Sequence, residues 1–177
     1  MDKKSTEKQE KIFSLLTHVA NAVKGGALIF ATFFLILVIV APSMGAWTNV
    51  SDKIVKEQAE KIVSGGLICM FFSFLSAIAA WILTKTVQDE AEYTKRFSDK
   101  STHVRLFVTG SLLLLTAICH LIVRFAAFHS NYLYISVVFH ALGACVFFAL
   151  GGLYGYLRKH YVENPKGDYL RTRKNDR

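Results

Sequence analysis

The sequence predicts an all-α fold: a polytopic membrane protein in which four transmembrane helices form a bundle, preceded by an N-terminal amphipathic helix. Apolar residues make up 53% of the 177 residues, and charged residues lie mostly outside four apolar blocks. Each block has roughly the 20 residues that a helix needs to cross the hydrocarbon of a bilayer. None alternates apolar and polar residues as a membrane-barrel strand does, so the blocks predict helices over residues 27–47, 62–83, 106–123 and 132–157.

The segment before the first block predicts the amphipathic helix. Within residues 1–26, lysines lie opposite an apolar face that recurs every three or four positions and comprises Ile12, Leu15, Leu16, Val19 and Val23. This spacing is typical of a helix that lies on the cytosolic membrane interface, and Gly25 with Gly26 should end it. The alternative is a cytosolic extension of the first transmembrane helix. At the far end of that helix, Pro42 should bend or end it.

Lysine and arginine are distributed unequally along the chain. Five precede the first block, five fall between the second and third blocks, and seven lie in residues 158–177, a basic tail. Only three fall in the first connection and none in the short third one at residues 129–131, while Arg124 belongs to the end of the third helix. The positive-inside rule therefore predicts that both termini and the middle connection face the cytosol, in the plasma membrane or an endomembrane. The formal net charge of +8 then reflects topology and contact with anionic lipid headgroups, and indicates no nucleic-acid partner.

Small residues recur at every fourth position in two of the blocks. In membranes such stripes let helices approach each other closely, so they predict packing faces within the bundle. Self-association, or docking onto a larger membrane complex, is the alternative. The residues are Gly65, Cys69, Ser73 and Ala77 in the second block and Gly151 and Gly155 in the fourth.

The stretch from residue 119 to 140 places ionisable side chains in otherwise apolar sequence. His120 lies eight residues before Phe128 and His140 eight after Tyr132, so both should lie about 12 Å from the outer end of an antiparallel helix pair. Arg124 follows His120 by one turn on the same face. Because ionisable groups are costly to bury in lipid, these three residues are candidates for a ligand-binding site. The alternative is structural: Arg124 would extend to the interface, and each histidine would bond to a neighbouring helix.

Enzyme motifs are absent from the sequence. It contains no phosphate loop, nucleotide fingerprint, HExxH or GxSxG, and no aspartate or glutamate lies within the four blocks. We therefore expect no catalytic residue, no metal site and no proton-coupled pump. No cofactor is expected either, with one alternative: His120 and His140, at one depth on facing helices, could be the axial ligands of a single haem b.

Short motifs across residues 60–157 resemble the C-terminal half of the fungal lipid-translocating exporters of the aminocholesterol-resistance type. One helix of that family opens on a lysine and a glycine–leucine step before aromatic residues, as do Lys61, Gly66, Leu67, Phe71 and Phe72. Its last helix is introduced by a His-x-x-Tyr-x-Tyr pattern, which His129, Tyr132 and Tyr134 resemble. Arg124 also matches, whereas His120 and His140 stand where the family has arginine and aspartate. The resemblance implies lipid handling and adds Tyr134 to the ligand-binding candidates.

Taken together, these features predict a non-enzymatic integral membrane protein that binds or translocates a lipid or other amphipath. Two alternatives remain from the residues alone: a structural or accessory subunit of a larger membrane complex, and a b-type membrane redox protein with one haem. Membrane lipids are the expected partners, together with either a second copy of the chain or a larger complex.

The topology is directly testable. Reporter domains fused after Lys100 and after Arg177 should both be found in the cytosol, and a fusion after Asp52 on the opposite side. If the first two fusions report different sides, the number of membrane crossings differs from four.

Overall fold

The computed structural model describes residues 3–47, 53–93, 100–128 and 130–159, with side chains over 10–43, 56–92, 100–128 and 130–159. These residues form four helices: α1 (Lys3–Trp47), α2 (Lys53–Tyr93), α3 (Lys100–Ala126) and α4 (Asn131–Arg158). All four are long and apolar enough to cross a membrane, and the described residues contain no strand. The predicted all-α membrane bundle is therefore confirmed.

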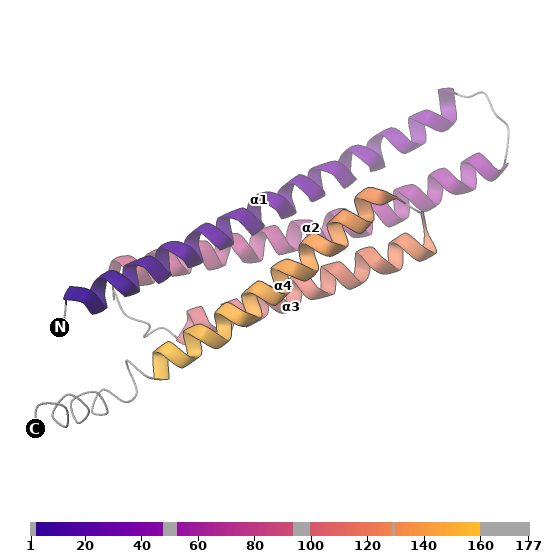
Figure 1. The fold of residues 1–177 in the computed structure, drawn as a ribbon. Coiled ribbons are helices and arrows are strands. Elements are labelled where there is room, and N and C mark those ends of the chain that lie inside the picture. The colour runs from indigo at the N-terminus through magenta and orange to yellow at the C-terminus, as the bar shows by residue number, and fades with distance from the viewer. Residues whose placement is uncertain (1–2, 48–52, 94–99, 129, 160–177) are drawn as a thin grey trace, which may run out of the picture.

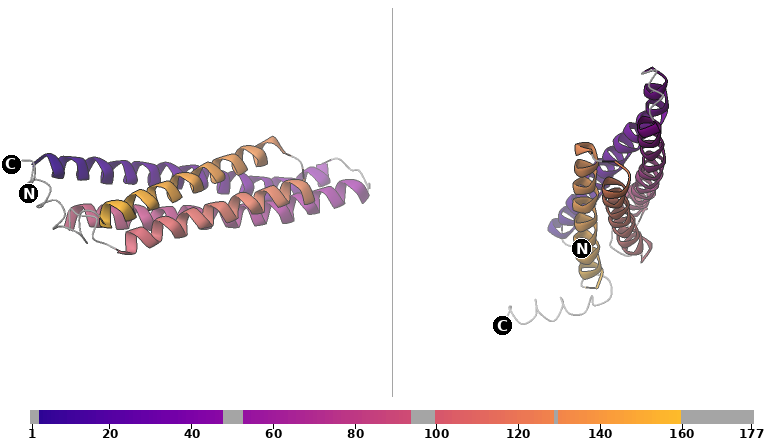
Figure 2. Two further views of the ribbon diagram at one scale, coloured as in Figure 1. Left: turned by 60° about the horizontal axis from the view of Figure 1, so that its bottom comes forward. Right: turned by 90° about the vertical axis from the view of Figure 1, so that its right-hand side faces the viewer.

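The helices run alternately up and down (Figure 1). α1 begins and α4 ends at the same end of the bundle, which we call the inner end; the α3–α4 turn marks the outer end. α1 packs along α2, α2 along α3, and α3 along α4, whereas α1 approaches α4 over a much shorter length. α4 is inclined to α1, as Figure 2 shows, so the fourth side of the bundle is closed mainly by side chains.

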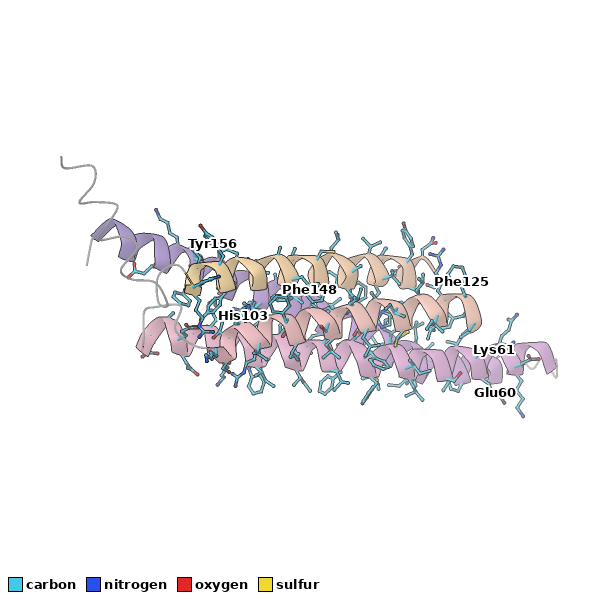
Figure 3. All side chains as sticks on the ribbon, turned by 90° about the horizontal axis from the view of Figure 1, so that it is seen from below. Glu60, Lys61, His103, Phe125, Phe148 and Tyr156 are labelled. Atoms are coloured by element: carbon cyan, nitrogen blue, oxygen red, sulfur yellow. The ribbon has the colours of Figure 1, made fainter. Side chains whose placement is uncertain are left out.

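Two helices are far longer than their apolar blocks. α1 has 45 residues and α2 has 41, because the charged sequence flanking each block continues the helix. At the outer end α2 passes the α3–α4 turn: Figure 3 shows Glu60 and Lys61 projecting from α2 beyond Phe125. Lys61 pairs there with Glu57 at 3.0 Å, one helical turn away. Of the first connection predicted between residues 47 and 62, only 48–52 lie outside the described helices.

The first part of α1 differs from the expected separate interfacial helix. α1 is continuous through Gly25, Gly26 and Pro42. Gly26 serves packing instead of ending the helix, because a Cβ atom there would lie only 2.2 Å from the Phe139 ring of α4. Of the predicted apolar face, Ile12, Leu16, Val19 and Val23 pack against protein, whereas Leu15 is exposed. The alternative reading, an extension of the first transmembrane helix, describes this segment.

That apolar face joins the larger of two core clusters. Phe13, Leu16, Ala20 and Val23 of α1 are buried beside residues of the other three helices, including Val87, Leu106, Phe147 and Tyr154. A smaller cluster lies toward the outer end and comprises Phe34, Cys69, Val123 and Leu133. Residues 160–177, most of the predicted basic tail, lie outside the described part of the chain.

Both small-residue stripes face α3. Gly65, Cys69, Ser73 and Ala77 are all buried in α2. A Cβ atom at Gly65 would lie 2.8 Å from the Val123 side chain, one at Gly151 2.9 Å from the Phe107 ring, and one at Gly155 2.8 Å from the His103 ring. The predicted packing stripes are thus occupied by side chains of this chain's own α3.

Two adjacent leucines test how the first part of α1 packs. Leu16 is 2% exposed and Leu15 is 52% exposed. We expect Leu16→Ala to lower the free energy of unfolding by about 2–4 kcal/mol, because it leaves a cavity in the larger core cluster. Leu15→Ala should change it by less than about 0.5 kcal/mol. Thermal unfolding in detergent micelles measures both, and equal effects would mean that this face does not pack on the bundle.

Candidate functional site

His120 of α3 and His140 of α4 meet inside the bundle. Their ring centroids lie 5.1 Å apart with an interplanar angle of 81°, and both side chains are fully buried. The common depth predicted from their spacing to the hairpin ends therefore brings them into edge-to-face contact. Neither histidine reaches lipid or water directly.

Ser136 joins the two rings. Nδ1 of His140 lies 2.7 Å from the Ser136 main-chain carbonyl and 3.3 Å from its hydroxyl. Because a carbonyl can only accept, the proton of a neutral His140 resides on Nδ1. The Ser136 hydroxyl lies 2.8 Å from Nδ1 of His120 and is fully buried. Ser136 thus bonds to both histidines from one turn of α4.

His120 completes a directed hydrogen-bond chain. Its Nε2 lies 3.1 Å from the Cys69 main-chain carbonyl and 3.4 Å from the Ser73 hydroxyl, both on α2. Nε2 therefore donates to the Cys69 carbonyl, and Nδ1 accepts from the Ser136 hydroxyl. Every polar atom of the His120 ring has a protein partner. This side chain is a structural cross-link between α2, α3 and α4.

His140 is different, because one of its nitrogens has no partner. Nε2 is buried and makes no hydrogen bond to any of the described residues. Since Nδ1 is tied back to its own helix, Nε2 is directed away from the α4 backbone, toward the centre of the bundle. The rings packed on that of His140 are aromatic: Phe139, with ring centroids 5.2 Å apart, Phe30 of α1, at 5.6 Å, and His120. Nε2 of His140 is therefore a buried acceptor without a partner, and its ring is surrounded by aromatic side chains.

Arg124 and Tyr134 do not belong to this cluster, which corrects the prediction of one shared site. The Arg124 guanidinium lies over the Tyr134 ring, 5.0 Å from its centroid. Tyr134 is 54% exposed. A long side chain one turn outward from His120 reaches the exposed ring more easily than the buried centre. Of the four predicted ligand-binding residues, two converge and two form a separate pair nearer the outer end.

Several residues of the site escaped the sequence analysis. Ser136 is the bridge, and its position four residues before His140 on the same helical face was an available signal. Ser73 was noted only as a small residue, yet it contacts His120. Phe30 and Phe34 of α1 contact the two rings, and nothing in their sequence distinguishes them from other apolar residues of the first block.

A buried carboxylate lies at the inner end. Glu90 is 4% exposed within α2, and the Tyr154 hydroxyl of α4 donates a short hydrogen bond to it. The His103 ring of α3 stacks on Tyr154 at 6.3 Å and 23°. The expectation that the spans carry no acidic residue holds for the apolar blocks, but α2 continues past its block and buries this one. Glu90 links α2 to α4, two helices that do not approach each other closely.

The histidine pair does not suit a haem held between two axial histidines. The rings touch each other edge to face, which leaves no space between them for a macrocycle. Nε2 of His120, the nitrogen that would face an iron, is bonded to the Cys69 carbonyl. Among the described residues, no three His, Cys, Asp or Glu side chains gather as metal ligands do.

A separate pocket of about 410 Å³ lies at the outer end, where α2 passes the α3–α4 turn. Its walls are Gln58, Ile62, Phe125, Ala127 and Phe128. None of the residues of the histidine cluster lines it. The pocket is therefore separate from the histidine cluster.

The chain matches no protein-family model, no curated protein and no solved structure. The resemblance to lipid-translocating exporters rests on the quoted motifs alone.

The cross-linking role of His120 is testable by substitution. His120→Leu leaves the Ser136 hydroxyl and the Cys69 carbonyl without their partner, so we expect unfolding to cost about 1–3 kcal/mol less. His18→Leu is the matched control, because His18 is exposed and bonds only within its own helix. Thermal unfolding in micelles should separate the two variants; equal melting temperatures would contradict the cross-link.

Proposed function

We propose that this chain is a non-enzymatic integral membrane protein that binds a lipid or other amphipath at the level of His140. Four helices long and apolar enough to cross a membrane make the bilayer its solvent. The observation that carries the proposal is the buried Nε2 of His140, which lacks a hydrogen-bond partner among the described residues. We place the inner end in the cytosol, on the distribution of basic residues along the sequence.

The two buried histidines differ in their hydrogen bonding, and this difference supports the proposal. His120 and His140 lie in contact, are buried to the same degree, and differ in that only His120 has both nitrogens bonded. A buried polar atom without a partner costs about 1–3 kcal/mol. Because a ligand that supplies the missing bond removes that cost on binding, the site favours occupancy by a molecule with a polar group. A purely structural histidine gains nothing from such an arrangement.

The surroundings suit a ligand that arrives from lipid. α1 and α4 approach each other over a short length, and the half-buried rings of Phe30 and Phe139 fill the space between them. An acyl chain or another apolar body is compatible with these rings. A polar group at its end is what Nε2 of His140 would contact.

The other two readings have less support in the geometry. A subunit that docks through its small-residue stripes would need them on the surface, yet both stripes pack against α3. The single-haem reading would need the two rings to separate and His120 to release the Cys69 carbonyl.

The proposal is tested by native mass spectrometry of the protein released from its own membranes. We expect a lipid-sized adduct on the unmodified chain that His140→Asn loses. Asparagine keeps an amide near the position of Nδ1 and carries no polar atom at that of Nε2. Gln58→Leu, in the outer pocket, is the control and should keep the adduct. Absence of any adduct, or equal retention by all three proteins, would contradict a ligand at His140.

A further inference from the structure

We infer that the ligand is an uncharged amphipath with a hydroxyl group, which enters between α1 and α4 and donates a hydrogen bond to Nε2 of His140. This inference rests on the proposed function and names the chemical class of the ligand. It follows from the hydrogen-bond direction, the local charge and the route of access.

The direction of the hydrogen bond selects a donor. Nδ1 of His140 carries the proton, because it bonds to the Ser136 carbonyl at 2.7 Å. Nε2 therefore presents an electron pair and can only accept. Ether and ester oxygens, which have no proton to give, cannot satisfy it. A hydroxyl can.

The local charge selects a neutral molecule. The rings around His140 are those of Phe30, Phe139 and His120, and Phe34 packs on His120. Arg124 lies over Tyr134 at the outer end, and Glu90 is buried against Tyr154 at the inner end. Lys24 of α1 donates to the Asn21 side chain at 2.9 Å, on the inner side of Gly26. A phosphate, carboxylate or ammonium would lose its hydration at this level and meet no opposite charge, which is costly in a medium of low dielectric.

The route of access lies between α1 and α4. The Phe139 ring rests on Gly26, where α1 has no side chain, and lies 5.4 Å from the Phe30 ring at 47°. Both rings are half-buried, so each borders the membrane on one side and the histidine layer on the other. Because α1 and α4 pack against each other over a short length only, the path that we infer needs movement of these two side chains. Figure 2 shows the inclination of α4 to α1.

The test uses photoreactive probes in phosphatidylcholine nanodiscs. One probe is a long-chain alcohol that carries a diazirine, and its partner is the methyl ether of the same alcohol, which cannot donate. A third probe is the matching carboxylate. Peptide mass spectrometry locates the label, and an excess of unlabelled alcohol identifies the saturable fraction.

We expect the alcohol to label the peptides that contain Phe30 and Phe139 in a saturable way, about 2- to 10-fold more than the ether or the carboxylate does, as one hydrogen bond allows. His140→Asn should remove this difference. His140→Gln, which places an amide oxygen near the position of Nε2, should restore part of it. Unfolding temperatures of both variants show whether the bundle is intact.

The outcomes are distinct. Saturable labelling of these peptides by alcohol and ether alike would overturn the hydroxyl inference and leave amphipath binding in place. Stronger labelling by the carboxylate would overturn the inference of an uncharged ligand. No saturable label between α1 and α4, or label confined to the peptide with Phe128 at the outer pocket, would overturn both this inference and the proposed function. The comparison of probes on the unmodified protein needs no variant to fold.

Discussion

The hydrogen bonds of Ser136 are the constraint on which the centre of the bundle depends. The hydroxyl contacts His120 at 2.8 Å and the carbonyl contacts His140 at 2.7 Å, so one residue of α4 bonds to both rings. Through His120 the chain continues to the Cys69 carbonyl on α2. Three helices are thereby held at one level, although helix association in lipid has little hydrophobic driving force. The same bonds leave Nε2 of His140 as the single ring nitrogen of the pair without a partner.

α3 organises the packing around this layer. Aromatic side chains of α3 pack on Gly151 and Gly155 of α4, and Val123 lies over Gly65 of α2. Close approach on two faces leaves α3 little freedom to shift or rotate. The Ser76 and Thr116 hydroxyls, 2.8 Å apart, add a further bond between α2 and α3 one turn inward from His120. On the α1–α4 side the Phe139 ring fits against Gly26, and the Phe30 ring packs beside it.

Much of the fold could be predicted from the sequence, and part of the site. Apolar blocks of membrane length determine the number of helices, and equal spacing from the hairpin ends put His120 and His140 at one depth. Their contact further required a rotation of each helix about its own axis, which depends on the packing of all four. Arg124 shows what helical spacing does not predict. It follows His120 by one turn, but its long side chain packs on the Tyr134 ring. The lysines at the start of α1 favoured a position at the membrane interface. The sequence alone does not show that Val87 and Tyr154 offer an apolar surface on which this segment packs.

The register of α1 against α4 has a consequence for the surrounding bilayer. The Phe33 and Tyr132 ring centroids lie 4.7 Å apart, and Gly26 lies under Phe139. The apolar block of α1, from residue 27 onward, therefore lies beside only the first residues of α4, at the outer end. The inner half of α4, with exposed Leu142, Leu153 and Tyr156, runs beside the amphipathic first part of α1. Two neighbouring helices thus present apolar bands at different heights. Lipids along this side must tilt, stretch or compress to match both bands, and such hydrophobic mismatch costs fractions of a kcal/mol per ångström. This mismatch falls on the boundary between α1 and α4, where the Phe30 and Phe139 rings lie.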